Sequence, residues 1–533
     1  MIAKVYSAIP QGYNGSIVEV EGDANRGLPA FNIVGMANKT ISEARERVRS
    51  ALVNSGFEFP ARKVTISLAP AELAKDGAHL DLPIALAILV LSQQLLPADV
   101  VDRLFVGELS LDGLTKPVRG IINIVEEAKH AGYREIYLPT ANLAQAKLVK
   151  GIKIIGVKSL LELFLSLKGQ NFRLKQPNVV KNTQKEADPA SSPLLDDICG
   201  QALARRALTI ALAGHHNLLL TGPPGSGKTL LARTAATLLP PLSPSEQVEV
   251  TKLHSLVGSS DQIVAARPFR APHHTASVAA IIGGGPRLTP GEISLAHRGI
   301  LFLDEFPEYP RNILEALRQP LEDRTVNLTR ADLRTTYPAD FILLATMNPC
   351  PCGHLDDPDH ACRCTPTQIQ NYRHRISGPI LDRIDLRLEV KKVDQAELSQ
   401  KLTHNTANVV KNTKLEVTKG TKNGQKIGKN PQFGQKHLAA KNAIASARKR
   451  QSERYHRPGY YNSSLTSAEV TQYVDLHPAA RQLLIDASTR FALSARSYFK
   501  IIKVAQTIAD LARADQVQAE HLAEALSLRE RAI

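Results

Sequence analysis

Gly222-Pro-Pro-Gly-Ser-Gly-Lys-Thr229 stands between an apolar run, Asn217-Leu-Leu-Leu-Thr221, and a stretch with helical periodicity, Leu230–Leu239. These flanks predict a buried strand, then a tight loop, then a helix. Glycines let successive backbone N–H groups turn inward on a phosphate chain, and the start of the helix adds its dipole. The complete motif with both flanks favours a phosphate-binding loop over a chance glycine-rich turn. Its residues are Gly222, Pro223, Pro224, Gly225, Ser226, Gly227, Lys228 and Thr229.

The chemistry of such a loop assigns roles to its last two residues. Lys228 is expected on the β- and γ-phosphates of ATP, and Thr229 is expected to bind Mg²⁺. A second apolar run, Gly299-Ile-Leu-Phe-Leu, ends in Asp304 and Glu305. Acids at a strand end are common. After a phosphate-binding loop, however, they predict that Asp304 binds Mg²⁺ through water and that Glu305 is the general base.

Three more residues are candidates for the same reaction. Asn348 follows the apolar run Phe341–Met347, where it could orient the attacking water, or it could be an ordinary turn residue before Pro349. Phosphoryl transfer also needs positive charge near the γ-phosphate. Arg383 and Arg496 are candidates for this role, and spacing alone does not separate either from a surface arginine.

Four of the five cysteines lie within fifteen residues, as Cys350-Pro-Cys352 and Cys362-Arg-Cys364. Four thiolates suit tetrahedral Zn²⁺, and the short loop between the pairs indicates a structural rather than a catalytic zinc site. His354 and His360 lie inside the loop and could replace a cysteine. Four free thiols or a redox pair are the alternatives, but clustered cysteines in a cytosolic protein favour a metal site.

Length and composition indicate a soluble multidomain protein. A chain of 533 residues is too long for one hydrophobic core, so about two to four domains are expected. The longest apolar stretch, Leu82–Leu91, is about half the length that spans a bilayer, and no secretory signal is evident, so a cytoplasmic protein without membrane contact is expected.

The net charge of +15 comes mostly from one segment. Residues 401–450 hold twelve Lys and Arg against one acid, Glu416, and so supply +11 of the total. Such a segment is either a solvated spacer or a source of non-specific affinity for DNA. The charge is therefore weak evidence about the folded surface.

Periodicity predicts an α/β multidomain protein. Strands are expected at 17–20, 63–68, 104–106, 135–138 and 152–157 in the first part, with helices at 42–55, 82–95 and 121–131. The last part is helical, most clearly at 478–491, 497–514 and 519–531. The predicted division is a first domain at 1–167, a linker at 168–195, an ATPase core at 196–395, a Lys/Asn-rich insertion at 396–435 and a helical lid at 436–533.

Four further stretches carry a family resemblance. They are Arg267-Pro-Phe-Arg-Ala-Pro-His-His274, Pro290-Gly-Glu-Ile-Ser-Leu-Ala-His297, Leu317-Arg-Gln-Pro-Leu-Glu322 and Met347-Asn-Pro-Cys-Pro-Cys-Gly353. With the nucleotide motifs, the chain resembles the AAA+ ATPases, more narrowly their magnesium-chelatase-like branch and the bacterial ComM/YifB family within it. The resemblance covers nearly the whole chain. It implies a central parallel sheet, Asn348 as sensor 1, Arg383 as an arginine finger acting in trans, Arg496 as sensor 2, and a ring, usually a hexamer.

The same resemblance implies two elements that face the pore of the ring. They are an insert at about 256–290 and a hairpin at about 324–337. Lys and Arg spaced along phosphates would let them follow DNA without reading bases. The candidates are Arg267, Arg270, His273, His274 and Arg287 on the insert and Arg324, Arg330 and Arg334 on the hairpin. Each taken alone is more readily explained as a solvated or interface charge than as a phosphate ligand, but two separate basic elements together favour DNA.

The first domain resembles the proteolytic domain of Lon. The likeness rests on Lys75-Asp-Gly-Ala-His-Leu-Asp-Leu-Pro83, Asp112-Gly-Leu-Thr-Lys-Pro117 and Ile136-Tyr-Leu-Pro139. His79 falls where the nucleophilic serine of Lon should be, and Pro117 falls where its lysine should be, with Lys116 one position away. Since histidine has no hydroxyl nucleophile, we expect a scaffold without peptidase activity.

The resemblance implies an ATP-dependent hexameric DNA helicase. It would promote branch migration on single-stranded, double-stranded or branched DNA during homologous recombination in natural transformation, with ATP, Mg²⁺ and Zn²⁺ as cofactors. The alternative is a protein-remodelling ATPase like the magnesium chelatase motor, which would need a protein partner. An ATP-dependent protease is disfavoured by His79 and Pro117.

Overall fold

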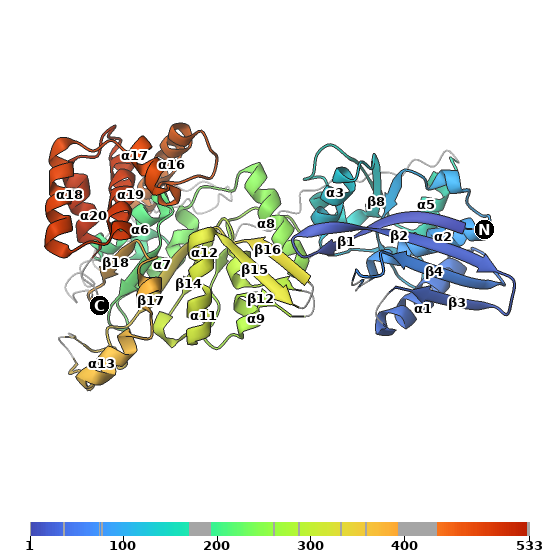
Figure 1. The fold of residues 1–533 in the computed structure, drawn as a ribbon, viewed down its shortest axis with the longest axis horizontal. Helices are drawn as coiled ribbons and strands as arrows, with labels where there is room; N and C mark the ends of the chain where they lie inside the picture. The colour runs from blue at the N-terminus through green and yellow to red at the C-terminus, as the bar shows by residue number, and fades with distance from the viewer. Residues whose placement is uncertain are drawn as a thin grey trace, which may run out of the picture.

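The computed structural model is elongated, with three regions in chain order (Figure 1). An N-terminal α/β region lies at one end, a central region surrounds a parallel sheet, and C-terminal helices pack on the far end of the central region. The structure describes residues 2–35, 38–73, 75, 78–169, 193–258, 262–285, 288–330, 333–355, 357, 360–392 and 434–529. Most of the predicted linker and of the Lys/Asn-rich insertion falls outside these ranges.

A mixed sheet of seven strands forms the N-terminal region. In spatial order the strands are β3 (Ala30–Val34), β4 (Lys63–Ala69), β2 (Asn14–Asn25), β1 (Ile2–Gln11), β5 (Arg103–Phe105), β8 (Glu135–Pro139) and β9 (Lys153–Val157). Val64, Ile66 and Leu68 alternate with polar residues along β4 and are buried, which is the pattern of a strand with one face on the core. β1 pairs antiparallel with β2 and parallel with β5, so the sheet changes direction at its centre.

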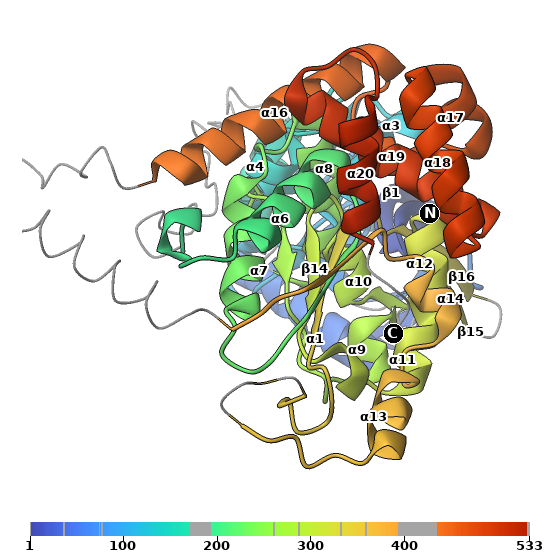
Figure 2. The same ribbon diagram turned by 90° about the vertical axis from the view of Figure 1, so that its left-hand side faces the viewer.

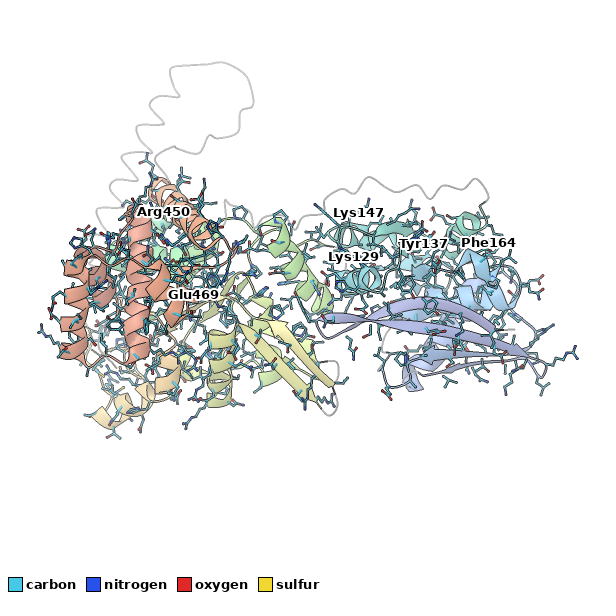
Figure 3. All side chains as sticks on the ribbon, turned by 45° about the horizontal axis from the view of Figure 1, so that its top comes forward. Lys129, Tyr137, Lys147, Phe164, Arg450 and Glu469 are labelled. Carbon is cyan, nitrogen blue, oxygen red and sulfur yellow. The ribbon has the colours of Figure 1, made fainter. Side chains whose placement is uncertain are left out.

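Helices cover this sheet. They are α1 (Asn38–Asn54), α2 (Asp81–Leu91), α3 (Ile121–His130), α4 (Leu143–Ala146) and α5 (Leu160–Leu167), and a short hairpin adds β6 (Glu108–Leu109) and β7 (Thr115–Lys116). All of α2 is buried, and its residues after Asp81 are apolar all round, so it is a core helix. Phe164 on α5 and Tyr137 on β8 are labelled in Figure 3. Phe164 packs against Phe57 with ring centroids 4.9 Å apart, and Tyr137 stacks on Phe105.

The central sheet is parallel. Its spatial order is β11 (Phe269–Arg270), β14 (Ile300–Leu303), β17 (Ile342–Met347), β10 (Leu218–Thr221) and β18 (Leu386–Glu389). Because all five strands run the same way, the loops that follow them meet at one edge of the sheet. The loops that precede β10 and β18 meet at the opposite edge, where the N–H of Asp385 donates to the carbonyl of Asn217 at 3.1 Å.

Short helices and two hairpins surround this sheet. The helices are α6 (Ala202–Gly214), α7 (Lys228–Leu238), α8 (Pro244–Val257), α9 (Val278–Ile281), α10 (Glu292–Leu295), α11 (Arg311–Ala316), α12 (Arg318–Asp323), α13 (Pro366–Arg373) and α14 (Gly378–Leu381). The hairpins are β12 (Gly283–Gly284) with β13 (Thr289–Pro290) and β15 (Thr325–Arg330) with β16 (Leu333–Pro338).

The C-terminal helices share a core with the central sheet. They are α16 (Gln435–Tyr455), α17 (Ser467–Tyr473), α18 (Pro478–Phe491), α19 (Ala495–Ala512) and α20 (Ala519–Ser527) (Figure 2). Leu218 and Leu220 of β10 lie in one apolar cluster with Ile501 and Ile508 of α19. The helical region is therefore anchored on one face of the sheet rather than tethered beside it.

A compact contact joins the N-terminal and central regions. α3 lies against α8, and the Nζ of Lys252 is 2.5 Å from the carboxylate of Glu126. The turn between β1 and β2 contacts the β15–β16 hairpin, because the N–H of Tyr13 donates to the Oγ1 of Thr335 at 3.3 Å and the Tyr13 ring meets the edge of Tyr337.

Several expectations about elements are confirmed and others are incomplete. The helix predicted at 478–491 matches α18, and each predicted N-terminal strand overlaps an observed strand, with at most one residue outside it. β1 and β3 had not been predicted, and α2 ends at Leu91 rather than at 95. Among the described residues, no helix combines the length and the apolar character needed to cross a membrane.

Candidate nucleotide site and metal centre

The predicted phosphate-binding loop connects the end of β10 to the start of α7. Gly225 and Gly227 adopt φ of 74° and 84°, in the left-handed region that favours glycine. α7 begins at Lys228, so its N-terminal backbone N–H groups point toward the loop. This is the backbone arrangement that binds phosphates.

Lys228 is held inside the loop by the loop's own backbone. Its Nζ donates to the carbonyls of Gly222 at 2.7 Å and Pro223 at 2.8 Å. Burial lowers the pKa of Lys228 to about 8, although Asp304 and Glu305 partly oppose this. The Lys228 ammonium is thus bound by two backbone carbonyl oxygens. Phosphate oxygens would bind it more strongly, because a phosphate carries full negative charge.

The predicted magnesium ligands lie next to each other. Thr229 Oγ1 donates to Asp304 Oδ2 at 3.0 Å, since β14 and β10 end at the same edge of the sheet on either side of β17. The second oxygen of Asp304 accepts hydrogen bonds from the hydroxyl of Thr346 and, at 3.2 Å, from the N–H of Glu305. A hydroxyl and a carboxylate at this spacing suit the oxygen ligation that Mg²⁺ prefers.

Thr346 is a site residue that the sequence analysis missed. Besides its bond to Asp304, its Oγ1 accepts the N–H of Glu305 at 3.3 Å. Glu305 has a φ of 51°, uncommon for a residue other than glycine, and its side chain is 54% exposed. Thr346 therefore fixes the backbone of Glu305, the predicted base, whose own carboxylate is exposed.

The insert reaches this carboxylate. β11 pairs with β14, and four residues beyond β11 the Nδ1 of His274 lies 3.7 Å from Glu305 Oε2. The hydroxyl of Tyr309 donates to the carbonyl of Pro272 at 2.5 Å, which holds this part of the insert in place. His274, expected to contact DNA, thus lies beside the predicted general base.

Asn348 follows β17 at the same edge, and the cysteine loop starts directly after it. Gly353 has a φ of 83° and approaches the phosphate-binding loop so closely that a Cβ there would lie 2.8 Å from the ring of Pro224. The same Cβ would lie 3.9 Å from the Asn348 side chain. The cysteine loop therefore packs on both the phosphate-binding loop and the predicted sensor.

The four cysteine sulfur atoms converge. Cys350 Sγ lies 3.4 Å from Cys352 Sγ and 3.7 Å from Cys362 Sγ, and Cys352 and Cys362 are 3.6 Å apart. Cys364 completes a group whose atoms all lie within 4.8 Å of one another. A disulfide needs about 2.05 Å, whereas four sulfurs at about 2.3 Å from a tetrahedral Zn²⁺ lie about 3.8 Å apart. The donors fit zinc.

The two histidines of this loop form a separate group. The Nδ1 atoms of His354 and His360 lie 3.0 Å and 3.4 Å from the carboxylate of Asp357. All four cysteines already stand together, so neither histidine is needed to complete that set.

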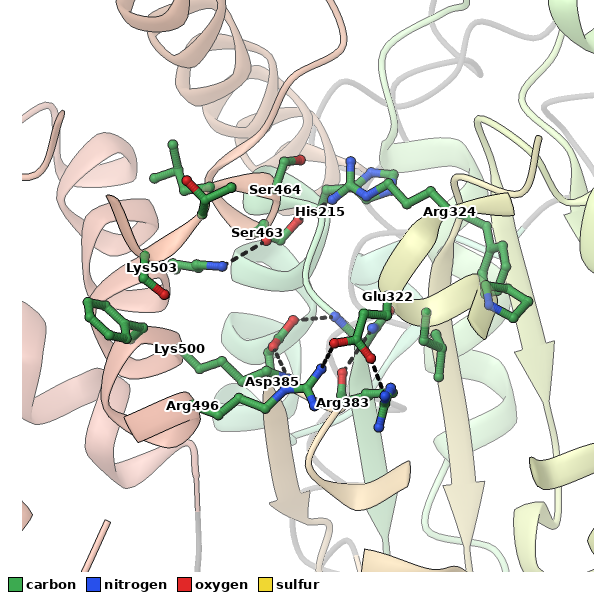
Figure 4. A pocket seen from close by; sticks show the side chains of 18 of the residues that line it. His215, Glu322, Arg324, Arg383, Asp385, Ser463, Ser464, Arg496, Lys500 and Lys503 are labelled. Atoms are coloured by element: carbon green, nitrogen blue, oxygen red, sulfur yellow. Dashed lines mark hydrogen bonds and ion pairs between the residues drawn. The ribbon is translucent and has the colours of Figure 1, made fainter. Parts of the chain in front are cut away.

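Arg383 and Arg496 lie together on the opposite edge of the sheet. Both contact Glu322 at the end of α12: Arg383 Nη2 donates to Oε2, and Arg496 Nη2 is 3.0 Å from Oε1 (Figure 4). The two guanidinium groups hold the pKa of Glu322 below its usual range against the effect of burial. β10 separates this edge from its own phosphate-binding loop, and its four residues span roughly 13 Å.

Three of the arginines predicted to contact DNA form ion pairs with acidic residues, and two others are exposed on the β15–β16 hairpin. Arg267 is 7% exposed and bonds Glu246 at 2.9 Å, so the expectation that it contacts DNA is corrected: it is a structural ion pair. Arg270 pairs with Glu292 at 2.5 Å, and Arg324 pairs with Asp340 at 3.3 Å. His273 bonds Thr275. Arg330 and Arg334 are exposed on the β15–β16 hairpin, and Arg287 lies outside the described residues.

At the site compared with Lon, the structure offers a backbone contact. His79 Nε2 is 3.1 Å from the carbonyl of Arg119, and Lys116 is exposed on β7.

Comparisons with known proteins cover all three regions. Sequence models of three families match: magnesium chelatase, subunit ChlI, over residues 194–398; subunit ChlI of Mg-chelatase over 20–142; and magnesium chelatase, subunit ChlI C-terminal, over 435–529. The chain is 40% identical to the uncharacterized protein YifB of Salmonella typhimurium, over 99% of this chain and 97% of that one. It is 39% identical to the competence protein ComM of Haemophilus influenzae, over the same shares. The magnesium-chelatase 67 kDa subunit of Heliobacterium mobile is 27% identical over 37% of this chain and 32% of its own length. With full-length identity at this level, the chain belongs to the magnesium-chelatase-like family of ComM and YifB proteins.

Proposed function

We propose that the chain is an ATP-hydrolysing ring motor that moves DNA. One observation carries the proposal: Lys228, Asp304 and Glu305 stand at one edge of the central sheet, and Arg383 and Arg496 stand at the other. A protomer therefore has the residues to hold ATP, while its own Arg383 and Arg496 lie away from the position of the γ-phosphate. A neighbour that presents its opposite edge would supply one, which favours a closed ring, and a hexamer is the family's usual form.

Each residue has a defined task in this reaction. Lys228 exchanges the carbonyls of its loop for phosphate oxygens, and Asn348 orients the attacking water. Glu305 takes the proton of that water. Thr229 and Asp304 would hold Mg²⁺, which when bound neutralises charge on the phosphates.

We place DNA on the β15–β16 hairpin. Arg330 and Arg334 are exposed there, as a contact with phosphates requires. One full-length relative is called a competence protein, which favours DNA taken up in natural transformation as the substrate, and branch migration in recombination as the outcome.

The cysteine group and the N-terminal region complete the proposal. Cys350, Cys352, Cys362 and Cys364 would hold one structural Zn²⁺ that fixes the loop beside Pro224 and Asn348. Residues 1–167 would be a scaffold related to the proteolytic domain of Lon and without peptidase activity.

A second candidate function is protein remodelling. It is favoured by the three family models, each described as a magnesium chelatase subunit. Such a motor would respond to a protein partner rather than to DNA.

The test is ATP hydrolysis with and without three-stranded DNA, together with strand displacement on the same substrate. We expect DNA to stimulate hydrolysis and ATP to drive displacement, with DNA affinity falling steeply with salt. Glu305→Gln should bind ATP and lose turnover by about 10²- to 10⁴-fold. ATPase activity that ignores every DNA form would reject the DNA motor and leave the remodelling ATPase.

A further inference from the structure

The edge of the sheet opposite the nucleotide holds a cavity of 630 Å³ with an excess of positive charge. Among the residues that line it are five cations, Arg324, Arg383, Arg496, Lys500 and Lys503, and two acids, Glu322 and Asp385. How the acids are distributed decides what the cavity can bind.

One of the two acids, Asp385, is already paired with residues around it. Its carboxylate lies 2.7 Å from Lys500 Nζ and 3.5 Å from the Nδ1 of His216, and it accepts the N–H of Asn217 at 3.2 Å. It is 10% exposed, so its charge is matched inside the fold. Asp385 therefore does not neutralise the arginines.

Glu322 is the acid that engages the arginines, and it lies near solvent. It is 47% exposed, and Arg496 is 40% exposed. Each of its oxygens takes one guanidinium, from the turn before β18 and from the start of α19, and Figure 4 shows both side chains converging on it. A phosphate group offers oxygens of the same kind to two guanidinium groups and carries more charge.

We propose that Glu322 is a positioning residue that occupies the arginine pair until a phosphate of the neighbouring subunit's ATP replaces it. In the single chain it holds Arg383 and Arg496 side by side, ready to bind an anion. It also competes with that anion, so the ring closes only when a nucleotide is present to displace the carboxylate. The inference rests on the proposed ring, whose neighbour supplies the phosphate.

The contact could instead serve only to tie α12 to the C-terminal helices, and the two roles differ in their effect on anion binding. If the contact of Glu322 is only structural, removing the carboxylate would leave the affinity for anions unchanged or reduce it. A competitor, once removed, leaves a vacant pair of guanidinium groups that binds anions more tightly.

The experiment measures pyrophosphate binding to the full chain carrying Lys228→Ala, which disables the phosphate-binding loop. Adding Glu322→Ala or Glu322→Gln should tighten binding about fivefold, the size of one exposed ion pair. Further substitution of Arg383 and Arg496 by alanine should remove the gain. The control is Glu315→Ala, which breaks the neighbouring ion pair of Glu315 with Arg318 (2.5 Å) and should change nothing.

Turnover provides a second readout in the chain with an intact loop. Glu322→Gln should lower the KM for ATP several-fold and keep kcat within about twofold, because the carboxylate competes with binding and takes no part in the chemistry. Unchanged pyrophosphate affinity in both Glu322 variants would overturn the inference. Wild-type chains that never assemble or hydrolyse ATP would overturn the ring instead, and the pyrophosphate titration would still judge Glu322.

Discussion

Lys228, at the scale of single residues, shows how a site can be ready for a ligand. Its ammonium is buried among carbonyl oxygens of its own loop, so its pKa lies near 8 instead of 10.5. Phosphate oxygens would supply the negative charge that these carbonyls lack. The sequence identified Lys228 by its motif, but its present partners follow only from the folded loop.

ATP binding should therefore take up a proton at alkaline pH. Below about pH 8 the free chain already carries a charged Lys228, so none is taken up. Between pH 8 and 10.5 binding restores the charge, and affinity should fall by up to about tenfold per pH unit. Calorimetry in buffers of different ionisation enthalpy at pH 7 and 9 measures the uptake. Equal affinity at both pH values, or the same uptake in Lys228→Arg, would contradict it.

The roles of two further residues could not be predicted from sequence patterns. Thr346 lies within an apolar strand, and no pattern separates its hydroxyl from a buried structural one, yet it binds both Asp304 and the Glu305 backbone. Arg267 stood in a basic motif, but its partner Glu246 lies on a separate helix. Both cases depend on contacts between distant segments, which spacing does not encode.

Among the elements, the cysteine loop connects the cysteine cluster to the phosphate-binding loop. Its sulfur atoms converge at one end, and Gly353 packs on Pro224 of the phosphate-binding loop. Local spacing was enough to predict the cysteine cluster. The contact with the phosphate-binding loop was not predictable, because it needs β17 and β10 to be neighbours in the sheet.

Loss of the metal should be felt at the nucleotide. We expect one zinc per chain, and Cys362→Ser should release it and weaken ATP binding. It should also destabilise the central region by about 2 kcal/mol or more, roughly 4–8 °C in Tm. Cys199→Ser is the matched control, since Cys199 is the cysteine outside the cluster. Elemental analysis with ATP titration measures both effects, and zinc retained in Cys362→Ser would reject the ligand set.

In the whole molecule, the parallel strands of the central sheet place the residues that would bind ATP at one edge. The arginines that would complete the site of a neighbouring subunit lie at the opposite edge. Helical periodicity predicted α18 correctly, and the strand motifs placed Asp304 and Asn348 at one edge. The position of Arg496 could not be predicted, because it depends on how the C-terminal helices pack on the sheet. The structure puts it with Arg383, across the sheet from the loop of its own chain.

Two inactive chains should therefore restore each other. The Arg383→Ala chain keeps an intact phosphate-binding loop, and the Lys228→Ala chain keeps an intact Arg383. Mixed rings therefore contain sites in which the intact loop of one chain meets the intact Arg383 of its neighbour. Random assembly of equal amounts puts about a quarter of the sites in this state. ATPase activity of the mixture, against each chain alone, measures the effect. A mixture as inactive as its components would show that Arg383 acts within its own chain.

The turn at Tyr13 ties the N-terminal sheet to the hairpin that carries Arg330 and Arg334. Tyr13 covers Tyr337, and the Nζ of Lys252 lies 4.1 Å from the centre of the Tyr13 ring. Deleting the first 167 residues would thus remove the Tyr13 ring from Tyr337 and leave the Lys252 ammonium without its ion pair with Glu126. A shortened chain that loses activity would report an altered hairpin as much as a missing domain.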